Sequence, residues 1–147
     1  MARRVFFSFH YQNDVWRAAN IRNSHIVEGV AAAGFSDASI WEEAKKKGDA
    51  AIKSMINKAL DGTTVTAVLI GSQTAQRKYV TYEIEESIRR GNGLLGIYID
   101  QIKDQDGNIS TRGAVPTALS KAGAPVYTWD RNQFGQWVEA AAKKAGR

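Results

Sequence analysis

Cysteine is absent from the 147 residues of this chain, and proline and histidine occur only twice each. Without cysteine, neither disulfide bonds nor thiolate metal sites can form. The two histidines, His10 and His25, lack the spacing of metal ligands, so we expect no metal site. No apolar run approaches the roughly 20 residues of a membrane span, and the opening residues do not have the pattern of a signal peptide. We therefore expect a cytoplasmic protein that does not engage a membrane.

The charge balance lacks a concentrated basic region. Twenty Lys and Arg residues against fifteen Asp and Glu residues give a net charge of +5, but the basic residues are scattered along the chain, with only short groups near its two ends and at residues 45–47. No aromatic residues alternate with them to stack on bases, so we expect no nucleic-acid partner. A positive surface would still attract a small polyanion such as a dinucleotide.

A strand, a loop and a helix are predicted between Thr64 and Arg90. Residues 64–70 are β-branched and apolar almost throughout, which is typical of a central strand covered on both faces. Gly71 ends this strand, and small polar residues follow. The expected helix has one apolar face, formed by Val80, Ile84 and Ile88.

Three acids lie on this helix, and one of them lacks a basic partner. Glu85 and Glu86 each precede an arginine by four residues, an order that stabilises a helix surface, whereas Glu83 precedes a serine. A carboxylate just past the carboxyl end of a central strand lies where open α/β sheets bind ligands. From position alone, a solvated helix residue is the better explanation of Glu83.

Strands and helices alternate along the rest of the chain. We expect further strands at residues 4–9, 39–41, 94–99 and 125–128. We expect helices from Val15 to Gly34, from a cap at Asp49 to Leu60, over residues 116–121, and from a capping box at Asp130 onward, with residues 42–48 as an exposed loop. This alternation predicts one domain over residues 1–147. Its fold class is α/β, flavodoxin-like, with three layers and a central five-stranded, mainly parallel sheet in the order 2-1-3-4-5.

Two motifs resemble ligand sites without meeting their requirements. The glycines of residues 91–96 have dinucleotide-binding spacing, but they lead from a helix into a strand instead of the reverse. Asp104, Asp106 and Asn108 resemble the start of a calcium loop, but Gly107 falls at the wrong offset. We therefore expect a polar turn at the tip of an excursion over residues 100–112 that is peripheral to folding.

Three blocks, FFSFHYQND, VLIGSQTAQRKYVTYEIEES and GLLGIYI, resemble the TIR-like domain family of bacterial Thoeris anti-phage defence (ThsB-like), within the TIR superfamily. The resemblance spans residues 3–129. It implies a TIR-type fold and an NAD glycohydrolase or ADP-ribosyl cyclase-like enzyme that cleaves NAD between nicotinamide and ribose. It further implies an ADP-ribose-derived, often cyclic signal that activates an effector protein, a phage-derived trigger and self-association through TIR surfaces. NAD would be the substrate, and we expect no cofactor.

The same resemblance selects candidate site residues. The family's catalytic glutamate lies four residues after an aromatic position that is usually tryptophan, and Tyr79 and Glu83 match this spacing, with Val80 in place of a frequent cysteine. Independently, the nicotinamide ring is already cationic within NAD and needs little acid catalysis to leave, so one carboxylate can suffice to stabilise the ribosyl cation. We expect Glu83 to be exposed on its helix. Trp41 could stack on a flat ring or pack in the core with equal probability. The candidate substrate-binding residues are Phe9, His10, Tyr11, Asn13, Asp14, Trp41, Ser72 and Tyr79.

Two other functions are compatible with the pattern. A non-catalytic TIR-type module would use the same surfaces to bind another TIR domain. A receiver or flavodoxin domain fits less well, because HYQND follows the first strand where these folds need an acidic pair or a phosphate-binding loop.

Overall fold

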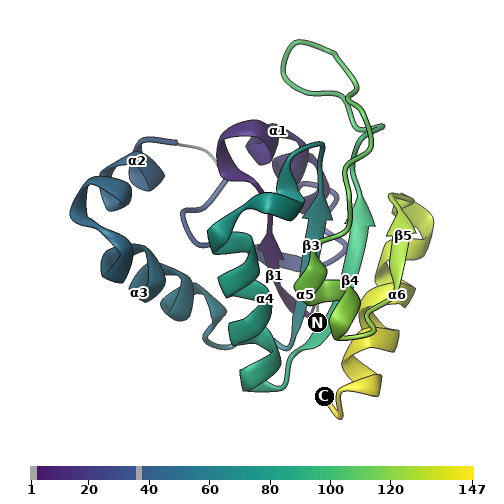
Figure 1. The fold of residues 1–147 in the computed structure, drawn as a ribbon. Coiled ribbons are helices and arrows are strands. Elements are labelled where there is room, and N and C mark those ends of the chain that lie inside the picture. Colours follow the sequence, from purple (N-terminus) through teal and green to yellow (C-terminus); the bar gives the residue numbers. More distant parts are fainter. Residues whose placement is uncertain (1–2, 36–37) are drawn as a thin grey trace.

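The computed structural model describes residues 3–35 and 38–147, and within them a parallel sheet has helices on both faces (Figure 1). The strands are β1 (Arg4–Ser8), β2 (Glu28–Val30), β3 (Val65–Ile70), β4 (Gly93–Tyr98) and β5 (Val126–Thr128). They pair in the order β2-β1-β3-β4-β5, and every pairing is parallel. The predicted fold class and strand order are confirmed.

Strand residues alternate between two layers of helices. The helical elements are α1 (Tyr11–Arg22), α2 (Ala38–Lys47), α3 (Asp49–Leu60), the 3₁₀ turn η1 (Thr74–Gln76), α4 (Lys78–Arg90), α5 (Thr117–Lys121) and α6 (Arg131–Lys144). On one face, Phe7 of β1 packs in the core cluster that contains residues of α1 and α6. On the other face, Phe6 packs with α3, while Val68 of β3 packs with α4 and α5. This two-sided covering explains why β1 and β3 have continuous apolar sequences.

β3 is the centre of the sheet. Each of its residues is buried, and it pairs with β1 on one side and β4 on the other. The position predicted for residues 64–70 is therefore confirmed. Because the carboxyl ends of all strands meet at one edge of a parallel sheet, β1 and β3 deliver their following loops to the same place.

The second strand was expected at residues 39–41, and this expectation is wrong. Those residues belong to α2. The second strand is instead Glu28–Val30, which pairs with β1 and lies inside the region predicted as one long helix. The first helix ends at Arg22. β2 has three residues and pairs on one side only, so it has too few side chains to show a period of two. Residues 42–47, expected as a loop, continue α2, whose last turn carries three lysines that suit a helix C-terminus.

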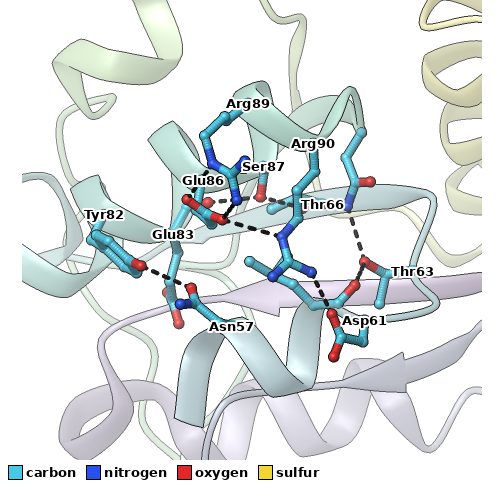
Figure 2. A network of polar contacts seen from close by, with 12 residues as sticks. Asn57, Asp61, Thr63, Thr66, Tyr82, Glu83, Glu86, Ser87, Arg89 and Arg90 are labelled. Atoms are coloured by element: carbon cyan, nitrogen blue, oxygen red, sulfur yellow. Dashed lines mark hydrogen bonds and ion pairs between the residues drawn. The ribbon is translucent and has the colours of Figure 1, made fainter. Parts of the chain in front are cut away.

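Three expectations about helix side chains are also wrong. Asp49 is the first residue of α3, and the N-cap is Gly48. Ile88, expected on the inner face of α4, is 46% exposed. Arg89 pairs with Glu86 rather than Glu85, while the expected pair of Arg90 with Glu86 is present at 3.2 Å (Figure 2). Asp130 does cap α6, since its side chain accepts a hydrogen bond from the Asn132 amide.

The excursion over residues 100–112 projects beyond the sheet at the top of Figure 1. Its tip is the expected turn, in which Asp104 Oδ1 accepts hydrogen bonds from the amides of Asp106 and Asn108, each at 2.9 Å. The excursion is nevertheless tied to α1. Buried Arg17 donates to the carbonyl oxygens of Ile102 at 2.7 Å and Asn108 at 3.0 Å. Polar composition alone does not predict this tether. Among the residues described, none of the helices combines the length and the hydrophobicity needed to span a bilayer.

Candidate functional site

A cavity of about 230 Å³ opens beyond the carboxyl ends of β1 and β3, with walls from α1, α2 and α4. Its lining residues fall into three groups. Aromatic side chains form one wall and cations lie along the lining from α2 and the start of α4, while the remaining residues are polar or small. The aromatic group is Phe7, Phe9, Tyr11, Trp41 and Tyr79; the cationic group is Lys45, Arg77 and Lys78; the rest are His10, Gln12, Ala31, Ala32, Val80 and Glu83.

Six of the nine candidate residues meet at this cavity. They are Phe9, His10, Tyr11, Trp41, Tyr79 and Glu83. The other three lie elsewhere. Asn13 is exposed on α1, whereas Asp14 is buried against Gly71 and forms an ion pair with Arg17 at 3.1 Å. Ser72 follows β3 and lies beside Gly113. Asn13 and Asp14 point elsewhere because one turn of α1 directs successive side chains to different sides.

Glu83 is buried, contrary to the expectation that it would be exposed on its helix. Its exposed fraction is 5%, and Ser8 at the end of β1 donates a hydrogen bond to its Oε1 at 2.6 Å. Burial raises the pKa of Glu83 to about 8, and the hydrogen bond from Ser8 opposes this rise only in part. At neutral pH Glu83 is therefore mostly the neutral acid in this environment.

The hydroxyl groups of Ser87 and Thr66 hold the backbone at Glu83 in place. Ser87 Oγ donates to the Glu83 carbonyl oxygen at 2.7 Å and also bonds Thr66 of β3 at 2.7 Å. Figure 2 shows the Glu83 side chain extending away from Glu86 and its two arginines. The neighbouring acid on the helix therefore has cationic partners, whereas the Glu83 carboxyl is directed toward the cavity.

The aromatic wall is a continuous series of ring contacts. Tyr11 stacks on Phe9 with ring centroids 5.6 Å apart and on Trp41 at 5.8 Å. Trp41 meets Tyr79 edge to face at 5.7 Å. Trp41 thus packs against the core and also faces the cavity, so both of its expected roles have a structural basis. The Tyr79 hydroxyl donates to Asp49 at 2.7 Å, which holds this end of the wall to α3.

The cations around the cavity differ in how strongly they are neutralised. Lys78 pairs with Asp49 at 2.9 Å, and Lys45 lies 3.7 Å from Glu42. Arg77 donates to the uncharged Gln73 side chain at 2.9 Å. Arg77 and Lys45 are therefore the residues best able to bind an anionic group there.

His10 is the second titratable group whose pKa is strongly shifted in the lining. Burial first, and then the charges of Arg77 and Lys45, lower the pKa of His10 to about 4, so its imidazole is neutral at physiological pH. Its Nδ1 is buried and has no hydrogen-bond partner among residues 3–35 and 38–147. The cavity lining therefore presents a neutral acid and a neutral imidazole together with nearby positive charge.

These features define what the cavity can bind. Its volume is below the roughly 300 Å³ at which pockets for whole small molecules begin, so it fits one end of a larger ligand. A flat ring suits the aromatic wall, and an anionic group suits Arg77 and Lys45. The Glu83 carboxyl would then lie beside the bound ring or the group attached to it.

The sequence reasoning gave no role at the site to Ser8, Asp49, Lys45 or Arg77. One signal for Ser8 was present, because a hydroxyl at the end of a buried apolar strand needs a hydrogen-bond partner. The two cations gave no signal, since each belongs to a polar stretch typical of solvated surface. Asp49 was assigned to a helix cap because aspartate is common there.

Comparison with known proteins adds to this geometry. The family model described as "Thoeris protein ThsB, TIR-like domain" matches residues 6–104. A protein of Bacillus cereus (strain MSX-D12), named "Putative cyclic ADP-D-ribose synthase ThsB1", is 51% identical over 118 residues, which is 79% of this chain. The match spans 62% of the length of that curated relative.

Proposed function

The chain belongs to the TIR-like domain family of the Thoeris protein ThsB, and from this premise we propose that it cleaves NAD between nicotinamide and ribose and forms a cyclic ADP-ribose product. The observation that carries the proposal is Glu83, a buried carboxyl at the lining of an aromatic-walled cavity. The matched region, residues 6–104, includes Glu83 and all the cavity residues on α1, α2 and α4. The cyclic product follows the name of the Bacillus cereus relative.

Binding of NAD uses the cavity for the nicotinamide end of the molecule. The pyridinium ring lies against the aromatic wall, where a flat cation is attracted by the faces of Tyr11 and Trp41. The pyrophosphate lies near Arg77 and Lys45. The adenosine end stays outside, since the cavity volume is too small for the whole dinucleotide.

Bond cleavage is heterolytic. The bond between the ribose C1′ and the pyridinium nitrogen breaks, its electron pair goes to nitrogen, and neutral nicotinamide leaves. Positive charge develops on the ribose, and the Glu83 carboxylate stabilises it. The positive pyridinium ring favours the ionised form of Glu83 over the neutral acid of the empty cavity, because an opposite charge nearby stabilises a carboxylate.

The fate of the ribosyl cation decides the product. Attack on C1′ by a nitrogen of the adenine of the same molecule closes a ring and gives cyclic ADP-ribose, whereas attack by water gives linear ADP-ribose and releases a proton. We propose that ring closure dominates, that the product activates a separate effector protein, that phage infection triggers the reaction, and that copies of the chain associate through TIR surfaces. These proposals rest on the family and on the name of the relative.

Glu83→Gln tests the proposal. It preserves size but removes the charge that the ribosyl cation requires, so nicotinamide release should fall at least about 100-fold. The matched control is Glu85→Gln, an exposed carboxylate on the same helix that should keep wild-type turnover. The assay follows nicotinamide release with and without extract from phage-infected cells, and circular dichroism checks the fold of each variant.

Wild-type turnover in Glu83→Gln would show that another residue is catalytic. If the wild type releases no nicotinamide under any activating condition, the chain is instead a non-catalytic TIR-type interaction module, and a co-purification assay with a second TIR domain becomes the appropriate test.

A further inference from the structure

We propose that Ser8 is a positioning residue for NAD cleavage: its hydroxyl holds one oxygen of the Glu83 carboxyl so that the other oxygen faces the ribose. This inference rests on the function proposed above. Ser8 was not among the site residues predicted from the sequence.

The geometry at Ser8 leaves its hydroxyl little freedom. Ser8 is fully buried as the last residue of β1, and its backbone is in register with Val68 of the central strand. Its Oγ lies 2.6 Å from Glu83 Oε1. Because β1 is held by the sheet, the donor occupies a fixed position relative to α4.

The two carboxyl oxygens of Glu83 have different surroundings. Oε1 accepts from Ser8, whereas Oε2 has no hydrogen-bond partner among residues 3–35 and 38–147. Oε2 is also not among the fully buried side-chain atoms of this region that lack a partner, so a small part of its surface is accessible. Since Glu83 lines the cavity, Oε2 is the oxygen that a bound ribose can reach.

The backbone of Glu83 is also held in place. The Glu83 carbonyl oxygen accepts from Ser87, which is bonded in turn to Thr66 of β3. The Glu83 backbone is therefore anchored to β3 and its carboxyl to β1. Such an arrangement keeps a catalytic group within a narrow range of positions before the substrate binds.

Loss of the Ser8 hydroxyl should act on the charge of Glu83. A hydrogen bond donated to a carboxylate stabilises the ionised form, and here it opposes the effect of burial. Ser8→Ala removes this donor where little water can replace it. A larger fraction of Glu83 is then protonated at a given pH, and the carboxyl is free to turn away from the ribose.

The first experiment compares Ser8→Ala with Ser87→Ala across pH. Ser87 is also a buried hydroxyl next to Glu83, but it bonds the backbone and not the carboxyl, so it is a matched control for lost packing and stability. Hydrogen bonds to charged groups contribute about 1.5–3 kcal/mol, so kcat should fall roughly 10- to 100-fold in Ser8→Ala with little change in KM. The rise of kcat with pH should move to higher pH in Ser8→Ala and stay in place in Ser87→Ala.

The second experiment does not depend on turnover. The carboxyl signals of ¹³C-labelled glutamate are titrated by NMR in the protein without NAD, and Glu83→Gln assigns the Glu83 signal by its absence. Glu83 should titrate at higher pH in Ser8→Ala than in the wild type. If Ser8→Ala does not fold, Ser8→Cys has nearly the same size with a much weaker donor and should shift the titration in the same direction.

An unchanged titration in Ser8→Ala, or an equal shift in Ser87→Ala, would overturn the proposal. So would a shifted titration with wild-type kcat at every pH. If the wild type releases no nicotinamide, the proposed function fails separately, and the positioning of a catalytic carboxyl by Ser8 is overturned with it, even where the titration moves.

Discussion

Burial disfavours the ionised form of Glu83, and the single hydrogen bond from Ser8 opposes this effect only in part. A carboxyl in this environment can stabilise a developing cation only if another group favours its ionised form. In the proposed reaction the pyridinium ring of NAD would bring a positive charge into the cavity, so the substrate itself would favour the ionised form of the acid. The reduced dinucleotide has a neutral ring and cannot do so, which distinguishes the two forms by charge.

The raised pKa of Glu83 predicts how stability depends on pH. Between its ordinary value of 4.5 and the folded value of about 8, the unfolded chain releases a proton that the folded protein keeps. The free energy of unfolding contributed by Glu83 therefore falls as pH rises through this window and is constant above it. Glu83→Gln removes the effect, so this variant should match the wild type near pH 4 and melt higher above pH 8, by on the order of 5–10 °C.

Thermal melts of both proteins from about pH 4 to about pH 9 test this prediction. His10, whose lowered pKa makes stability fall as pH decreases from 6.5 toward 4, is present in both proteins and cancels in the difference. A difference in Tm that stays constant over the whole range would show that the pKa of Glu83 is the same in the folded and the unfolded protein. An exposed Glu83, as expected from the sequence, would give near-identical melts for the wild type and Glu83→Gln. Because Glu83 is buried, we expect the two melts to differ.

The sequence could predict which residues approach the site but not how deeply each is placed. Phe9, His10, Tyr11, Tyr79 and Glu83 all follow the ends of strands that are adjacent in a parallel sheet, so topology alone brings them together. The buried carboxyl of Glu83 accepts a hydrogen bond from Ser8, which lies on a different element. Such a contact between distant parts of the chain leaves no periodic signal in either segment.

Strands covered on both faces were predicted from the sequence, as was the edge strand β5, whereas the other edge strand, β2, was not. β3 and β4 have apolar runs bounded by glycine or polar residues, whereas the three residues of β2 are half-exposed and precede a run of alanines that suits a helix. A similar ambiguity affected α2. Its lysines and glutamates are typical of a solvated loop as well as of an exposed helix, and propensity alone does not decide between them.

Two aspartate substitutions test whether residues in apolar sequence patterns are buried in the folded protein. Val68 and Ile88 both fit apolar patterns in the sequence, but Val68 is fully buried in β3 and Ile88 is 46% exposed on α4. Val68→Asp buries an unpaired charge at a cost of several kcal/mol and should abolish soluble expression. Ile88→Asp should express normally, with a Tm within a few degrees of the wild type. Soluble Val68→Asp, or insoluble Ile88→Asp, would contradict the packing of these two elements.

The net charge of the whole molecule affects the proposed binding of NAD. In the proposed function a net charge of +5 favours the approach of NAD, and Lys45 and Arg77 are the cavity cations that would bind its pyrophosphate. Salt screens such attraction over about 10 Å at 0.1 M. The affinity for NAD should therefore fall several-fold between about 50 mM and about 500 mM NaCl.

Calorimetric titration of NAD into Glu83→Gln measures this affinity without turnover. In that background, Lys45→Gln should weaken binding and reduce its salt dependence. Lys144→Gln lowers the net charge by the same amount at the far end of α6 and should do neither. Equal effects of the two substitutions would mean that net charge, and not the cation at the cavity, determines binding.

β1 precedes the other strands of this sheet in the chain, but its complete burial requires segments that are translated much later. β1 pairs with β3, which is translated only after residue 64, and Phe7 of β1 packs against Phe134 from the other end of the chain. A parallel pair cannot form as a hairpin, so neither contact exists while β1 is leaving the ribosome. The apolar segment from Val5 to Phe7 consequently remains exposed for most of translation. This order of events gives a chaperone that binds extended apolar segments its main opportunity on this protein, before folding begins and not after it fails.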